Sequence, residues 1–262
     1  MRLYLIRHAE SEHNVAQVYA GVTDSALTNH GMLQIEKLAD YFRHQGVQFT
    51  RVFCSPLQRA RVTADALKKD HDSKIVVPDL SEKDFGSLER KSWVSPPAAE
   101  TRDGFVPTES HEDLSARAKK FLDDYLPPVL QEGEEGEAVA VVSHGVILSV
   151  LWRTLKQMCA PLSFSFGPRA SLDSHPIIWS NTGYLELEIG MIPANDQDGT
   201  LAGSADLSAS LSIKVLVING RQHLVSLKRT RGIGSSKHDP KQRKMDAFFS
   251  TSSSPFKKDT KK

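Results

Sequence analysis

The sequence predicts an α/β fold, in which apolar strands alternate with helices along the chain. Two uninterrupted apolar runs, Leu3–Ile6 and Ala138–Val142, have the length of strands that are buried on both faces of a sheet. Each run ends abruptly in polar side chains: Arg7 and His8 follow the first, and His144 lies just beyond the second. Open α/β sheets place their ligands at the ends of such strands, so we expect a functional site there.

Helices are expected in the stretches between the strands. Thr28 is the expected N-cap of a helix that ends at Gly46, because a threonine hydroxyl accepts a backbone N–H of the first turn and glycine suits the residue after the last turn. Residues at helical spacing give this helix an apolar stripe of Leu33, Leu38, Tyr41 and Phe42.

The next strand is expected over Arg51–Cys54. The helix after it is expected to start at Ser55-Pro56, with the serine as the cap and the proline in the first turn. Apolar runs and alternation then predict strands over Lys74–Val77, Tyr184–Ile189 and Ile213–Gly220, the last two antiparallel, and helices from about Glu109 to Leu126 and over Val146–Leu155.

The composition is that of an ordinary globular protein, with 39% hydrophobic and 25% charged residues in a chain of 262. The two cysteines, Cys54 and Cys159, cannot form a disulfide framework, which favours a reducing compartment. The apolar start before Arg7 is too short for a secretory signal, and no apolar run is long enough to span a bilayer. We therefore expect a soluble protein of the nucleus or cytoplasm without a membrane partner.

Charge is unevenly distributed along the chain. Residues 228–262 hold 11 Lys or Arg against three Asp, so a body near −7 carries a tail near +8. The tail is also poor in aliphatic side chains, and such a segment cannot bury enough apolar surface to fold alone. We expect one folded domain over 1–227, with loop insertions at about 95–108 and 193–212, followed by a disordered basic tail that acts as an interaction arm.

Five separate motifs resemble those of the histidine phosphatase superfamily, the phosphoglycerate-mutase-like enzymes. Residues 7–14 (R-H-A-E-S-E-H-N) match the signature R-H-G-E-[ST]-x-x-N, except that Ala9 replaces the glycine. The other motifs follow in the family's order over residues 21–31, 55–64, 80–88 and 143–145. The resemblance covers roughly residues 1–227 and implies a three-layer α/β/α sandwich around a mostly parallel mixed sheet.

The resemblance also implies roles for the matching residues. His8 would take the phosphoryl group, and Glu82 would protonate the leaving oxygen and then activate water. Arg7, Arg59 and the catalytic His144 would bind the phosphoryl oxygens. The pocket around them would be lined by Ser11 and Asn14.

The residue types suit this chemistry without reference to the family. A neutral imidazole nitrogen can act as a nucleophile and divide hydrolysis into two easier steps. The guanidinium group offers paired donors that match a phosphate. Because such cations offset the charge of the transferring phosphoryl group, we expect neither a metal nor another cofactor.

Three functions remain open on the sequence alone. The first is a phosphatase that acts on a small phosphorylated substrate or a phosphoprotein. The second is a phosphoglycerate-type mutase, which is disfavoured because the mutases carry a longer basic insertion where residues 95–108 offer Arg102 alone. The third is a non-catalytic scaffold that acts through its tail, and the intact catalytic motifs argue against it.

The tail contains a second resemblance. Residues 242–249 (Q-R-K-M-D-A-F-F) resemble the box Q-x-x-[MLI]-x-x-[FY]-[FY] that docks on the replication sliding clamp, PCNA. Met245, Phe248 and Phe249 would lie on one face of a single helical turn, while Gln242 would remain on its extended entry. The alternative is a short helix that packs back on the body. Basic clusters at 228–231 and 241–244 also suit nuclear import or contact with DNA.

Overall fold

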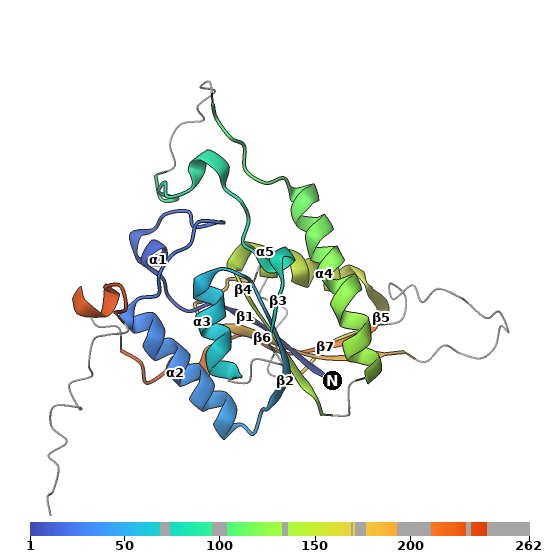
Figure 1. Ribbon diagram of the computed structural model, residues 1–262. Coiled ribbons are helices and arrows are strands. Elements are labelled where there is room, and N and C mark those ends of the chain that lie inside the picture. The colour runs from blue at the N-terminus through green and yellow to red at the C-terminus, as the bar shows by residue number, and fades with distance from the viewer. Residues whose placement is uncertain are drawn as a thin grey trace, which may run out of the picture.

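The computed structural model describes residues 1–68, 74–95, 104–132, 136–168, 170, 177–192, 211–228 and 232–239. These residues form a seven-stranded sheet in the order β3-β2-β4-β1-β6-β7-β5 (Figure 1). The strands are β1 (Arg2–Arg7), β2 (Phe49–Cys54), β3 (Lys74–Val76), β4 (Ala138–Ser143), β5 (Cys159–Phe166), β6 (Tyr184–Met191) and β7 (Leu211–Gly220). The α-helices are α1 (Glu12–Ala16), α2 (Asn29–His44), α3 (Gln58–Leu67), α4 (His111–Glu132) and α5 (Gly145–Gln157).

The sheet is mixed, with a parallel half next to β1. Strands β1, β4, β2 and β3 run parallel, whereas β6 is antiparallel to both β1 and β7. In the pairing of β1 with β4, Arg7 lies opposite Ser143. The polar residues that follow the two central strands therefore meet at one edge of the sheet.

Helices cover both faces of the sheet, so the predicted three-layer α/β/α architecture is confirmed (Figure 1). Along β1, Leu3 and Leu5 pack under α4 and α5, while Tyr4 and Ile6 pack against α2 and α3. This alternation follows from the period of two residues in a strand, and it explains why a strand buried on both faces reads as a continuous apolar run.

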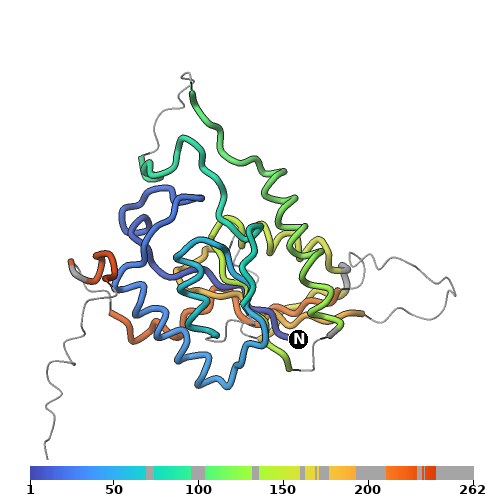
Figure 2. Tube along the Cα trace, in the orientation of Figure 1, coloured from blue at the N-terminus to red at the C-terminus, as the bar shows by residue number. Residues whose placement is uncertain are grey.

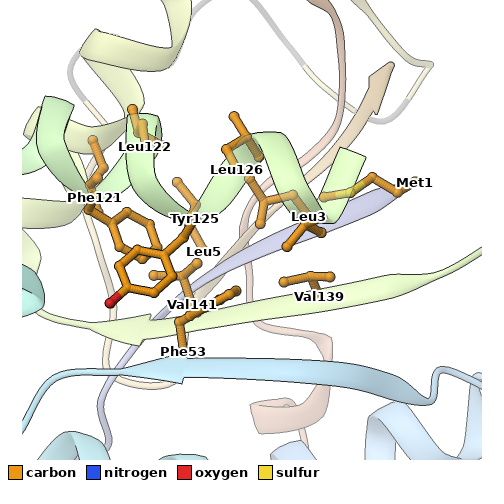
Figure 3. A pocket seen from close by; sticks show the side chains of 12 residues that line it. Met1, Leu3, Leu5, Phe53, Phe121, Leu122, Tyr125, Leu126, Val139 and Val141 are labelled. Atoms are coloured by element: carbon orange, nitrogen blue, oxygen red, sulfur yellow. The ribbon is translucent and has the colours of Figure 1, made fainter. Parts of the chain in front are cut away.

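Helix α4 seals one face of the sheet. In Figure 3 its Leu122 and Leu126 lie over Leu3, Leu5 and Val141 of the two central strands, around a small apolar pocket. The helix runs for 22 residues and passes through two prolines, Pro127 and Pro128, so it ends later than the predicted Leu126.

Two of four local predictions were wrong. Helix α3 begins at Gln58 with Leu57 as its N-cap, so Ser55 is not the cap. In α2 the stripe includes Ile35, while Leu33 points outward and is 42% exposed. The predictions for Thr28 and Gly46 are confirmed: Thr28 Oγ1 accepts the Gly31 N–H, and Gly46 takes a positive φ after the last turn.

Part of the segment after residue 227 lies against the body. Residues 232–239 lie beside the start of α2 (Figure 2), where Asn29 N–H donates to Ser236 O and His238 N–H donates to Leu27 O. Lys237 forms a β-bridge with Thr28. We call residues 232–239 the strap. The clamp-like box at 242–249 lies outside the described residues, as does most of the expected loop at 193–212.

No helix among the described residues is both long enough and apolar enough to cross a membrane. Cys54 and Cys159 are buried and are not joined by a disulfide.

Candidate active site

The candidate site lies where β1 and β4 end. The His8 N–H donates to Ser143 O at 2.9 Å, which continues the β1–β4 ladder by one residue. The chain therefore passes from the paired core strands β1 and β4 directly into the site. His8 and His144 are thereby placed side by side, with ring centroids 5.0 Å apart.

His8 is held in one tautomer. Its ring is 4% exposed, and Nδ1 lies 2.7 Å from the carbonyl oxygen of Ala9, an atom that can only accept. Nδ1 therefore carries the proton, and Nε2 keeps a lone pair. Burial, followed by the positive charges of Arg59 and Arg7, lowers the pKa of His8 well below its ordinary value. The ring is neutral near neutral pH, as a nucleophilic imidazole must be.

Arg59 and His144 form a buried pair behind His8. Arg59 Nε donates to His144 Nδ1 at 3.2 Å, so the proton of His144 lies on Nε2, which donates to Ser55 Oγ at 2.8 Å. Burial and the charge of Arg59 hold the pKa of His144 well below its ordinary value. Ser55 thus orients a histidine of the site instead of capping α3.

The Arg59 guanidinium is fully buried and tied to a turn-rich segment. Its Nη1 donates to Thr23 O, and its Nη2 donates to Ala20 O and Gly21 O, at 2.8 to 3.0 Å. Burial lowers the pKa of Arg59 to about 10, although the Glu82 carboxylate opposes this shift. Arg59 remains a cation at neutral pH.

Arg7 presents an unused donor. Its Nη1 donates to Trp179 O at 2.6 Å, whereas the buried Nε has no hydrogen-bond partner. Leaving a buried donor unpaired costs about 1–3 kcal/mol, and more for a charged group. Burial lowers the pKa of Arg7, and Glu82 opposes the shift. An acceptor that carries negative charge would relieve this cost.

Glu82 caps helix α5. Its Oε1 accepts N–H groups from Lys83 and Ile147, and its Oε2 accepts the Val146 N–H at 3.1 Å. A carboxylate at a helix N-terminus interacts favourably with the exposed N–H groups and the dipole. Arg117 fixes the loop below, because its Nη2 donates to Glu82 O at 3.1 Å.

Two other acids near Glu82 have structural partners. Glu109 is paired with Arg117, at 2.6 Å from Nε to Oε1 and 2.9 Å from Nη2 to Oε2. Asp84 Oδ1 accepts the Gly86 N–H at 2.7 Å. Among the described residues, Glu82 is the one carboxylate that lines the cleft above His8.

Asn14 lines the cleft, but Ser11 does not. Ser11 is fully buried and is the N-cap of α1, where its N–H and Oγ both contact Asn14 Oδ1. Asn181 joins this network, with Nδ2 donating to His8 O at 3.1 Å and to Asn14 Oδ1 at 3.0 Å. No motif pointed to this role, since Asn181 lies in a turn before β6.

Ala9 fits in place of the family glycine. It is fully buried, its N–H donates to Thr63 Oγ1 at 3.1 Å, and it is not among the described residues with a positive φ. The position therefore needs no left-handed backbone, and a methyl group is tolerated.

A cleft of about 460 Å³ opens above these residues. Its floor is formed by Arg7, His8, Glu82 and Gly145. Its walls are mainly apolar and aromatic, with Val18, Tyr19, Ala20, Phe85, Trp93, Val146, Ile177 and Trp179, together with the polar Asn14 and Ser149. These aromatic side chains were not predicted as site residues, because the sequence alone does not distinguish an aromatic residue that lines a cleft from one that packs in the hydrophobic core.

Comparisons with known proteins agree with this arrangement. The family model of the histidine phosphatase superfamily (branch 1) matches residues 3–171. A probable phosphatase of Schizosaccharomyces pombe is 35% identical over 257 residues, covering 94% of this chain and 79% of that protein. The adenosylcobalamin/alpha-ribazole phosphatase of Salmonella typhimurium is 32% identical over 63% of this chain and 85% of its own.

Solved structures share the fold. The alpha-ribazole phosphatase of Shigella flexneri superposes with a TM-score of 0.58 at 22% identity, over 84% of this chain and 96% of its own. A phosphoglycerate mutase of Bacillus anthracis superposes with a TM-score of 0.54 at 19% identity, over 71% of this chain and 87% of its own. The sheet order, the paired histidines and the family match lead to one conclusion: the chain belongs to the histidine phosphatase superfamily and has the phosphatase activity of that family.

Proposed function

We propose that this phosphatase hydrolyses a phosphomonoester through a phosphohistidine intermediate on His8, without a metal ion. The observation that carries the proposal is that one cleft is lined by His8, whose Nδ1 proton leaves Nε2 with a lone pair, and by Arg7, whose buried Nε has no hydrogen-bond partner among the described residues. The first atom is a nucleophile with its lone pair available, and the second is a donor in need of an anionic acceptor. Both residues line the same cleft.

In the first step, His8 Nε2 attacks phosphorus and the bond from phosphorus to the ester oxygen breaks. The departing oxygen takes a proton from Glu82, and the alcohol leaves. Proton transfer of this kind contributes about 10²–10⁴-fold in rate. Glu82 is suited to the role because it lies in the cleft with Arg7 and His8, and its Oε2 accepts only one N–H.

In the second step, a water molecule attacks the phosphorus of phospho-His8. Glu82, now ionised, takes a proton from this water, and the N–P bond breaks. Inorganic phosphate leaves, and His8 and Glu82 return to their starting protonation states. The atoms and charges therefore balance over one turnover.

The charge of the site favours a phosphate dianion. Two guanidinium groups, that of the buried Arg59 and that of the partly buried Arg7, lie near one acidic residue, Glu82, and both histidines are neutral. An excess of buried positive charge costs free energy until an anion offsets it. Fixed cations of this kind stabilise a transferring phosphoryl group. We expect full activity after treatment with a strong chelator.

The intermediate can be trapped directly. Rapid quench in base with a ³²P-labelled ester should leave label on the protein that is stable in base and labile in acid. The label should be absent from His8→Ala and retained by His44→Ala, an exposed histidine on α2. Label that persists in His8→Ala would reject His8 as the nucleophile.

A mutase is the second candidate, because a 2,3-bisphosphoglycerate-dependent phosphoglycerate mutase of Methylorubrum extorquens is 30% identical over 60% of this chain. A mutase must return the phosphoryl group to a second hydroxyl of its substrate, so it needs cations for a second acidic group. The described walls of the cleft carry none. Interconversion of 2- and 3-phosphoglycerate faster than phosphate release would favour the mutase.

We further infer that the tail recruits the phosphatase to the sliding clamp PCNA through Gln242, Met245, Phe248 and Phe249. The support is the match of residues 242–249 to the clamp-binding box and the basic charge around it. A segment that becomes ordered on docking loses part of its contact energy, so we expect a Kd of about 1 μM, or about −8 kcal/mol. Recruitment to the clamp requires that part of the protein is in the nucleus.

Fluorescence anisotropy with a peptide of residues 237–257 tests the clamp proposal. The matched control is the same peptide with Phe248→Ala and Phe249→Ala, which keeps the charge and removes the apolar plug. If the two peptides bind equally well, the binding comes from their charge alone, and the proposed role of the clamp-like box is wrong. A pure scaffold would have no phosphatase activity to lose. We therefore expect His8→Ala to lose the activity of the wild type and to keep its binding to the clamp.

A further inference from the structure

The walls of the cleft above His8 are built as a rigid apolar slot. The segment carrying Tyr19 pairs with residues 90–93: Tyr19 N–H donates to Lys91 O, Arg90 N–H donates to Tyr19 O, and Trp93 N–H donates to Gln17 O. These backbone bonds fix the two segments to each other. They also hold the Tyr19 and Trp93 rings in an edge-on arrangement with centroids 6.3 Å apart.

Glu89 ties this wall to the loop of the proton donor. Its carboxylate accepts backbone N–H groups from Gly21, Thr23 and Phe85 at 3.1 to 3.3 Å. The approach is so close at Gly21 that an added Cβ would lie 2.1 Å from Lys83 O. Phe85 is thereby packed on Tyr19, with ring centroids 4.6 Å apart.

Trp179, which also lines the cleft, is held in place as well. Trp179 is 6% exposed, and its Nε1 donates to Ser149 Oγ at 2.9 Å. Ser149 Oγ in turn donates to Gly145 O, so the polar atoms of this wall already have partners. What Trp179, Ile177 and Val146 offer to the cleft is apolar surface.

Charge is confined to the floor. Among the described residues that line the cleft, the charged ones are Arg7 and Glu82, both at the phosphate end. Lys83 lies near the rim, but it does not line the cleft, and its Nζ sits 6.0 Å from the centroid of the Phe85 ring. A second phosphate or a carboxylate on the substrate would therefore lose its hydration without gaining a cation in the walls.

We propose that the substrate is a phosphomonoester whose alcohol carries an uncharged, flat apolar group, such as an aromatic ring system, packed against the aromatic side chains that line the cleft, Tyr19, Phe85, Trp93 and Trp179. This inference rests on the proposed hydrolysis at His8 and names its substrate class. Aromatic walls suit a planar group because rings pack against each other in offset or edge-on arrangements at 4.5–7 Å. Trp93 is 39% exposed and gains cover when the slot is filled.

The test must separate binding from leaving-group chemistry, because aryl phosphates react faster for reasons unrelated to the slot. Two alkyl esters, 2-(1-naphthyl)ethyl phosphate and ethyl phosphate, release primary alcohols of similar acidity and differ in the ring system. With the full-length wild-type protein we expect kcat/KM for the naphthyl ester to be higher by about 10- to 100-fold, since burying a ring system removes on the order of 100 Å² of apolar surface from water.

Variants locate the effect. Tyr19→Ala and Trp93→Ala should each reduce this ratio by about three- to tenfold, mainly through a higher KM for the naphthyl ester. Met191→Ala is the matched control, since it removes a similarly exposed apolar side chain at the other end of β6. A ratio near one in the wild type, or an equal loss in Met191→Ala, would overturn the proposal.

Calorimetric titration of His8→Ala with the two esters measures binding without turnover. Tighter binding of the naphthyl ester supports the slot even if hydrolysis runs through another nucleophile, and equal binding overturns it. If the slot proposal is wrong, the protein treats the two esters alike. If the proposed function is wrong, neither ester releases phosphate. A test with 3-phosphoglycerate completes the set: turnover that exceeds that of the naphthyl ester would also overturn the proposal.

Discussion

At the residue scale, hydrogen bonds decide what each side chain of the site can do. His8 gives its Nδ1 proton to the carbonyl of Ala9, which leaves Nε2 free to attack. Glu82 is held by three backbone N–H donors, and two of them converge on Oε1. Oε2 has a single N–H donor, so it is the oxygen on which we place the transferred proton.

We predict that Glu82→Gln slows poor leaving groups far more than good ones. An amide cannot donate a proton to an alkoxide, whereas a nitrophenolate leaves without help. The expected loss in kcat/KM is about 10²–10⁴-fold for an alkyl ester and much smaller for 4-nitrophenyl phosphate. The measurement is a leaving-group series on both proteins, with Asp84→Asn as the control. A uniform loss across the series would assign Glu82 to capping α5 alone.

At the element scale, the strap couples the segment after residue 227 to the first motif. Its bridge to Thr28 lies next to Glu10, since Thr28 N–H donates to Glu10 O at 3.1 Å and Thr28 Oγ1 donates to Glu10 Oε1 at 2.9 Å. Glu10 is two residues from His8. The strap therefore supports the same loop that leaves β1 for the site.

We predict that the strap contributes to stability and the residues beyond it do not. Two truncations test this, one ending at Lys228 and one ending at Asp239. The shorter protein loses the bridge and two backbone hydrogen bonds, each worth about 0.5–1.5 kcal/mol, so its free energy of unfolding should fall by roughly 1–3 kcal/mol. Urea denaturation of both proteins would show it. Equal midpoints would mean that the strap adds nothing to the fold.

Comparison of the expected and observed elements shows which sequence patterns were sufficient to predict a strand or a helix cap. Strands β1 and β4 were predictable because apolar runs buried on both faces leave few alternatives. Strand β5 was not predicted: Pro161 lies within it, and a proline argues against a central strand. The sheet order places β5 at an edge, where a missing N–H costs little. The Ser55-Pro56 pattern led to a wrong cap, because α3 begins three residues later than Ser55, whose hydroxyl contacts His144 and accepts the Leu57 N–H.

At the scale of the whole molecule, the site is built from segments that are far apart in the chain. The motifs predicted that Arg7, Arg59, Glu82 and His144 gather at His8, and the structure brings them together. The apolar slot could not be predicted in this way. Its lining includes Tyr19 and Trp179, which are 160 residues apart in the chain and reach one cleft only in the completed fold.

Burial lowers the pKa of three buried histidines among the described residues. Besides His8 and His144, His223 is 5% exposed, and its Nε2 donates to Thr182 Oγ1, whose own proton goes to Asn181 O. Its Nδ1 has no partner, and its ring neighbours are Tyr41 and Tyr184. Burial lowers the pKa of His223 to about 4.

These pKa shifts predict that the protein loses stability as pH falls below 6.5. Between pH 6.5 and about 4, the unfolded chain binds a proton at His223 that the folded chain excludes, so the free energy of unfolding falls by about 3 kcal/mol from this residue. His8 and His144 act in the same direction. Glutamine keeps an amide donor near the position of Nε2 and cannot be protonated in this range. Urea denaturation from pH 7.5 to 4 should therefore give a flatter profile for His223→Gln than for the wild type, and parallel profiles would show that His223 accepts its proton without unfolding.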